Sequence, residues 1–162
     1  MTGLMPEVIP GAPREAPPGR ALGVDLGSVR IGLALSDPSR TVASPHEVLR
    51  RASNHAADHR AIIDIAREYD VTAIVVGLPL SLSGAKGPAA RAAEQEIEAL
   101  RAAVDTDVVV VAHDERLTTI SAERSLNEAR MSRADRTKVV DKVAAAIMLQ
   151  SWLELPSRPK RR

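Results

Sequence analysis

The chain has 162 residues and a mass of 17.3 kDa, the size of a single domain. With 44% hydrophobic and 27% charged residues it can bury an ordinary core, which excludes disorder throughout. Its 22 basic and 21 acidic residues leave a formal net charge of +1, so any contact with nucleic acid must come from a local patch.

Two residue types are scarce. The chain has no Cys, which excludes disulfides, thiolate zinc sites and cysteine nucleophiles, and which agrees with a reducing, cytoplasmic location. Tyr69 and Trp152 are the only aromatic residues, so a platform for base stacking has almost no material.

The two ends of the chain differ from its middle. Residues 1–19 hold five of the eleven prolines and show no helical or strand periodicity, which predicts a disordered arm. Residues 156–162 form a short basic tail. No stretch reaches the ~18 apolar residues of a membrane span, so we expect no membrane partner. One folded domain is expected at 20–155.

Strand patterns recur along this domain. Apolar or alternating runs bounded by turn residues predict strands at 21–25, 30–36, about 41–48 (interrupted by Pro45), 73–77 and 107–112.

Helical patterns lie between and after these strands. Asn54 should cap a helix that reaches Tyr69, and Pro88 suits the first turn of a helix to about residue 104. Two further helices are expected at 118–129 and 138–155. The order of elements favours an α/β domain with a mixed sheet.

Asp25 is the most informative acidic residue of the first strand. Because side chains alternate between faces, Asp25 shares one face with Gly23 and Gly27, and Gly32 adds another small residue on the partner strand. This face leaves room for a metal ion or a phosphate. The alternative is that Asp25 only ends a strand whose glycines serve close packing.

Two more acidic groups are candidates for the same site. Glu115 follows a buried strand of four valines, and sites of α/β proteins are usually built at such strand ends. Asp141 precedes the small residues Ala144 and Ala145 on the last helix, which would let the helix approach the sheet. A first-turn residue favoured by the helix dipole is an equally good interpretation of Asp141.

Together, Asp25, Glu115 and Asp141 indicate hard-cation chemistry. Carboxylates without thiols suit Mg²⁺ or Mn²⁺. Two such ions about 4 Å apart would activate a water and stabilise the leaving oxygen of a phosphodiester.

Four segments carry a resemblance to a known family. GVDLGSVRIG (23–32), VGLPL (76–80), DERLTT (114–119) and DKVAAAIMLQ (141–150) are similar, in the same order, to the motifs of the YqgF/RuvX family. The resemblance covers about residues 20–155. It implies a ribonuclease H-like fold with a five-stranded mixed sheet flanked by helices. It also implies a role as a Holliday-junction resolvase or as a nuclease that matures the 5′ end of pre-16S ribosomal RNA.

The resemblance implies that Asp25, Glu115 and Asp141 are the catalytic, metal-binding carboxylates. Well-studied junction resolvases of this fold place an acidic residue at the end of the fourth strand, where this chain has Gly77. Glu115 must then supply that carboxylate from the neighbouring strand.

Basic residues near these segments are candidates for substrate contacts. Arg30 lies on the face of Asp25, Arg116 follows Glu115, and Lys86 lies in a Gly/Ser loop before a helix, whose N–H groups attract anions. Arg133 and Arg136 belong to a basic stretch between the last two helices, the best local patch for phosphate contacts. The alternative for Arg116 is a surface salt bridge, and the alternative for Arg133 and Arg136 is a solvated, mobile connection.

The histidines are weaker candidates. His55 and His59 have helical spacing without a completed metal signature, so we interpret both as surface residues. His113 lies next to the acidic pair, where it either shuttles protons or only shapes the strand end.

A metal-dependent nuclease acting on pre-16S rRNA is therefore expected, with nucleic acid and ribosomal particles as partners. One alternative is a junction resolvase, which should be a symmetric homodimer. Another is a non-catalytic ribosome-assembly or transcription factor that retains the fold. A nucleotidase related to actin-like ATPases is disfavoured, because those need two such domains and this chain holds one.

Overall fold

The computed structural model describes residues 16–116 and 133–156, and for residues 133–139 it describes the backbone alone. The helix expected at 118–129 lies outside these residues, as do 1–15 and 157–162. No helix within the described ranges is long and apolar enough to cross a membrane.

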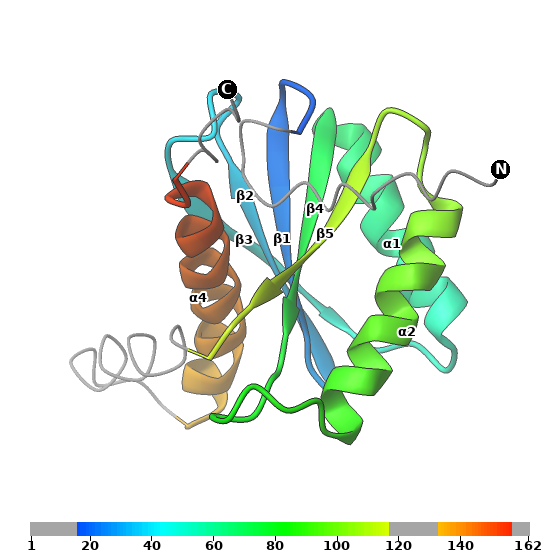
Figure 1. Cartoon of the computed structure of the whole chain (residues 1–162), viewed down its shortest axis with the longest axis vertical. Coiled ribbons are helices and arrows are strands. Elements are labelled where there is room, and N and C mark those ends of the chain that lie inside the picture. Colours follow the sequence, from blue (N-terminus) through cyan, green and yellow to red (C-terminus); the bar gives the residue numbers. More distant parts are fainter. Residues whose placement is uncertain (1–15, 117–132, 157–162) are drawn as a thin grey trace, which may run out of the picture.

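A five-stranded mixed sheet forms the centre of the molecule, which confirms the expected fold class (Figure 1). Its strand order is β3-β2-β1-β4-β5. β1 pairs antiparallel with β2 and parallel with β4, β2 pairs antiparallel with β3, and β4 pairs parallel with β5. The strands are β1 (Arg20–Leu26), β2 (Arg30–Ser36), β3 (Ala43–Arg50), β4 (Val71–Leu78) and β5 (Val109–Asp114).

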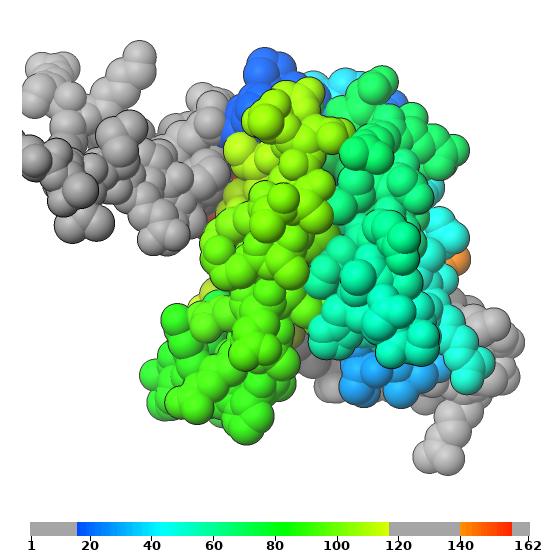
Figure 2. All heavy atoms as spheres, turned by 90° about the vertical axis from the view of Figure 1, so that its right-hand side faces the viewer, coloured from blue at the N-terminus to red at the C-terminus, as the bar shows by residue number. Residues whose placement is uncertain are grey.

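Helices cover both faces of this sheet. α1 (His55–Glu68) and α2 (Pro88–Ala103) lie side by side on one face, as Figure 2 shows from that side. α4 (Arg133–Leu153) packs on the other face, against β1, β2 and β3. Asn54 caps α1 by accepting a hydrogen bond from the Ala57 N–H, and Pro88 opens α2, as the sequence predicts.

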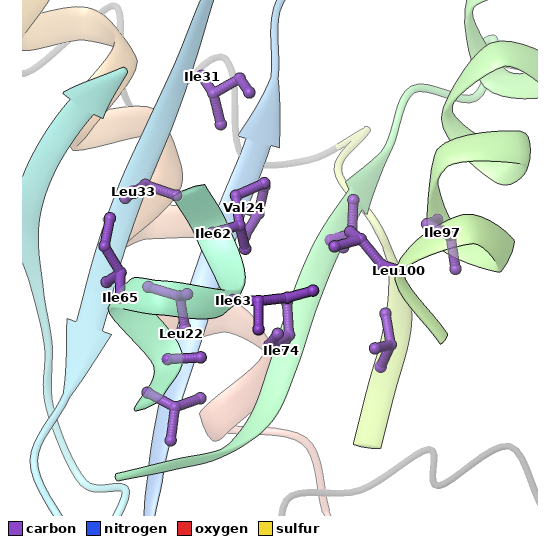
Figure 3. Packing of buried hydrophobic residues seen from close by; sticks show 14 residues of the cluster. Leu22, Val24, Ile31, Leu33, Ile62, Ile63, Ile65, Ile74, Ile97 and Leu100 are labelled. Atoms are coloured by element: carbon purple, nitrogen blue, oxygen red, sulfur yellow. The ribbon is translucent and has the colours of Figure 1, made fainter. Parts of the chain in front are cut away.

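Two apolar clusters hold the layers together. The first joins α1 and α2 to the sheet through branched side chains such as Leu22, Ile62 and Ile74, all fully buried (Figure 3). The second joins α4 to the sheet mostly through alanines and valines, with Trp152, Met148 and Leu149 as its large side chains. Small residues let a helix approach a sheet closely, and this determines where Asp141 lies.

Several boundaries differ from those the sequence predicts. β3 and β5 each begin and end two residues later than predicted, so β5 carries Asp114 as its last residue and ends directly before Glu115. α4 begins at Arg133 rather than at 138, because a helix that is stabilised by packing further along can extend through polar residues without an apolar face. Of the expected arm, Ala16 is buried in the second cluster, and the Pro17 carbonyl accepts a hydrogen bond from Thr72 Oγ1.

A buried ionic network around Arg51 connects the β1–β2 turn to α1 and α2. The Arg51 guanidinium donates to the Gly27 carbonyl, to Asp58 and, through two nitrogens, to both carboxylate oxygens of Glu96. His59 is buried, with Nε2 at 3.0 Å from Glu96 Oε1, so its interpretation as a surface residue is wrong; His55 is exposed as expected. Burial opposes ionisation of Glu96, but hydrogen bonds from Arg51 and His59 lower its pKa overall.

Candidate active site

Asp25 lies near the end of β1 on the face that α4 covers. Its backbone pairs with Gly32 of β2. No side chain or N–H group of the described residues donates a hydrogen bond to its carboxylate. Burial raises the pKa of Asp25 to about 6, and the charge of Asp141 adds to the increase. The site therefore holds Asp25 in surroundings that oppose its ionisation.

Asp141 reaches this region because glycines admit the backbone of α4. A Cβ atom at Gly32 would overlap the carbonyl group of Asp141, and one at Gly23 would lie 2.9 Å from Leu149 Cβ. The close approach of the helix is thus as the small residues predict. The space expected above these glycines for an ion or a phosphate is filled by α4.

Arg30 is the partner of Asp141. Its Nε donates to Asp141 Oδ2 at 2.8 Å, and both side chains remain partly exposed. Arg30 therefore lies on the face of Asp25 as predicted, where it fixes the orientation of the Asp141 carboxylate.

Glu115 places its carboxylate over Gly77. Its N–H continues the β4–β5 ladder with a bond to the Leu78 carbonyl at 3.4 Å. A Cβ atom at Gly77 would overlap Oε2 of Glu115, so the carboxylate fills the space that a side chain at 77 would take. Burial raises the pKa of Glu115 to about 7, and the charges of Asp25 and Asp114 add to this.

The three predicted carboxylates thus come from β1, the end of β5 and α4. They lie close enough for the charge of one to raise the pKa of another. Asp25 interacts with Asp141 on one side and with Glu115 on the other. The described part of the chain nevertheless contains no group of three or more His, Cys, Asp or Glu side chains close enough to hold a metal ion as it stands.

Three of the five predicted substrate-binding cations are already paired with carboxylates. Arg30 binds Asp141, and the Lys86 ammonium lies 2.5 Å from Glu94 Oε1. The Arg116 guanidinium binds Asp114, whose pKa it lowers. Arg133 and Arg136 lie in the first turns of α4 instead of in a connection, and their side chains are outside the described set.

Two basic residues next to the site were missed by the sequence analysis. Arg50 ends β3 directly opposite Arg30 in the ladder, and Lys142 follows Asp141 on α4. Both line one groove together with Arg30. Arg50 could have been found only from the pairing of β2 with β3, because the strand register is what places it opposite Arg30.

His113 points to α4 from its place beside Gly77 in the β4–β5 pair. Its Nε2 lies 3.1 Å from Ser151 Oγ. Burial lowers the pKa of His113, against the opposing effect of Asp114. Its contact with Ser151 ties the end of β5 to α4, and the two roles expected for His113 both stay predictions.

Comparisons with known proteins match the chain along almost its whole domain. A family model described as "RuvX: Holliday junction resolvase" matches residues 19–155. A protein of Roseiflexus sp. (strain RS-1) named "Putative pre-16S rRNA nuclease" is 43% identical over 85% of this chain and 95% of its own length. A protein of the same name from Rhodococcus opacus (strain B4) is 44% identical over 86% of this chain and 80% of its own length.

A solved structure supports the fold. The yeast mitochondrial Holliday junction resolvase Ydc2 aligns with a TM-score of 0.51 over 85% of this chain and 79% of that chain, at 16% sequence identity. Such identity speaks for the fold alone, and the fold agrees with the ribonuclease H-like class. With the family model covering the domain and relatives above 40% identity, the chain belongs to the RuvX family.

Proposed function

We propose that this protein is a divalent-metal-dependent nuclease that hydrolyses phosphodiester bonds in the 5′-end maturation of pre-16S rRNA. The observation that carries the proposal is the approach of Asp25, Glu115 and Asp141 from three separate elements. The names of the relatives supply the substrate.

The donor set fits a hard divalent cation. All three candidate ligands are carboxylates, the chain has no thiol, and Mg²⁺ and Mn²⁺ prefer such oxygen donors. Burial and, to a smaller extent, mutual repulsion raise the pKa values of Asp25 and Glu115, and a bound cation would favour the ionised form of both carboxylates. Because the carboxylates do not yet converge on one point, small side-chain rotations must complete the site.

Each residue has a distinct task in this proposal. Asp25 sits on the rigid β1 strand between the other two carboxylates and serves as the common ligand. Arg30 keeps Asp141 oriented through its 2.8 Å bond. Gly77 leaves the space in which Glu115 extends beside Asp25. When bound, divalent ions would supply an activated water and neutralise the charge on the leaving oxygen.

A junction resolvase is the second candidate, and the description of the matching family model favours it. A resolvase should form a symmetric dimer that cuts two strands of a four-way junction. A monomer that cuts RNA near an end would favour rRNA processing.

Cleavage of two labelled substrates tests the function. One is a four-way DNA junction and the other an RNA with the 5′ leader of pre-16S rRNA, each incubated with Mg²⁺, Mn²⁺ or EDTA. The proposal expects metal-dependent cleavage of the RNA. Cleavage of the junction but not of the RNA would show that the protein is a junction resolvase instead. No cleavage of either substrate, bare or within ribosomal particles, would favour a non-catalytic role.

A further inference from the structure

A groove of about 510 Å³ opens beside the candidate active site, where β2, β3 and α4 meet. The β1–β2 turn contributes Val29, whose side chain is 54% exposed. The residues that line the groove are Val29, Arg30, Glu47, Val48, Arg50 and Lys142. Three of these six are cations and one is an anion.

Two of the cations differ from the three predicted substrate-binding residues whose side chains the structure describes. Arg30, Lys86 and Arg116 each pair with a carboxylate. Within the described residues, by contrast, no carboxylate lies within ion-pair distance of Arg50 or Lys142. Glu47 is the one acidic residue in the lining, so among the described residues the groove keeps an excess of positive charge.

The strand register adds to this excess charge. Arg50 stands directly opposite Arg30 in the antiparallel β2–β3 pair. Like charges in this position destabilise a sheet, so the pair costs folding energy that an anion in the groove would offset. Asp141 neutralises Arg30, whereas no carboxylate of the described residues forms an ion pair with Arg50.

We propose that this groove binds the backbone phosphates of the nucleic-acid strand on one side of the cleavage position. Arg50 and Lys142 contact the phosphates, and exposed Val29 offers an apolar surface to a sugar or a base. This inference rests on the proposed function, because its ligand is the strand that the carboxylates would cut.

The strand order of the sheet indicates which side of the active site contributes most to binding the nucleic-acid strand. β1, which carries Asp25, lies between the groove at the β2–β3 side and the 79–87 loop at the β4–β5 side. On the loop side Lys86 and Arg116 are already paired. Most of the electrostatic affinity should therefore come from the groove side, without regard to base sequence.

Binding measured in EDTA tests this inference separately from cleavage. Wild type, Arg50→Gln, Lys142→Gln and the control Arg60→Gln are titrated with the leader RNA and the four-way junction at several salt concentrations. Arg60 is an exposed arginine of α1, on the opposite face of the sheet. Each groove substitution should weaken binding about two- to fivefold and reduce the salt slope by about 0.7 to 0.9, whereas Arg60→Gln should change neither.

Thermal unfolding separates a binding role from a structural one. Because Arg50→Gln removes a like-charge pair, its Tm should stay equal to that of the wild type or rise. Groove variants that bind as tightly as Arg60→Gln, or a wild type that binds neither probe, would overturn the inference. Groove-dependent binding without cleavage in Mg²⁺ or Mn²⁺ would contradict the proposed function and leave the groove supported.

Discussion

The carboxylate of Glu115 occupies the space directly above Gly77, on the strand that neighbours its own. A side chain at Gly77 would overlap Oε2 of Glu115. The missing side chain at the end of β4 and the acidic residue after β5 are thus two parts of one arrangement. A carboxylate is delivered beside Asp25 from β5 because β4 provides no obstacle to it.

Gly77→Ala should therefore impair catalysis more than folding. The added methyl group forces the Glu115 carboxylate away from Asp25, so metal-dependent cleavage should fall at least about tenfold. Stability should change by at most about 1–3 kcal/mol, as for a modestly overpacked site. Gly87→Ala is the matched control, because nothing lies within 4 Å of a Cβ atom there. Equal activity of the two variants would contradict this role of Gly77.

Moving the carboxylate between strands is a stricter test of the same arrangement. The double variant Gly77→Asp/Glu115→Gly presents an acid from β4 in the space that Glu115 vacates. It should cleave faster than Glu115→Gly alone. Circular dichroism should first show that the two variants are folded to the same extent. If the double variant is no more active than the single one, the position of the carboxylate over Gly77 does not matter for catalysis.

Metal-free protein should lose stability as the pH rises. Burial raises the pKa of Asp25 to about 6 and that of Glu115 to about 7, above their unfolded values. The contribution of these two carboxyl groups to the free energy of unfolding is fully present below about pH 4 and is lost as the pH rises through 6 and 7. The Tm in EDTA should therefore fall less in Asp25→Asn than in the wild type between about pH 4 and pH 7.5.

Mg²⁺ supplies the control for this pH effect. Above pH 7, an ion that binds the ionised carboxylates should raise the Tm of the wild type more than that of Asp25→Asn. An equal response of the two proteins would argue against metal binding at Asp25.

Arg51 should be important for stability, since its guanidinium joins two buried acids and the β1–β2 turn. Arg51→Met leaves Asp58 and Glu96 without their counter-charge and should cost about 3–5 kcal/mol. Urea unfolding measures this loss, with Arg60→Met as the control for an exposed arginine. A loss below about 1 kcal/mol would show that the network contributes no more than a surface pair.

The pattern of residues along a single strand or helix was sufficient to predict those parts of the site that one such element determines. Alternation along β1 placed Asp25 on the same face as Gly23, and the small residues of the last helix predicted its close approach to the sheet. The family motifs then predicted the fold class. These features are local, so spacing is sufficient to find them.

The remaining features depend on which elements become neighbours. His59 of α1 is buried where α1 packs against α2, beside Glu96, which lies 37 residues away in the sequence. Arg50 reaches the groove through the register of β2 and β3, and Glu115 lies over Gly77 through the register of β4 and β5. No periodicity within one segment contains this information.

Catalysis by the three carboxylates is tested most directly by cleavage of the leader RNA with Asp25→Asn beside Asp64→Asn, both purified identically. Asp64 is an exposed aspartate of α1, with a side chain 76% exposed. Asp25→Asn should bind RNA and fold like the wild type but should not cleave in Mg²⁺ or Mn²⁺, while Asp64→Asn should cleave normally. Undiminished cleavage by Asp25→Asn would contradict a carboxylate-based, metal-dependent site.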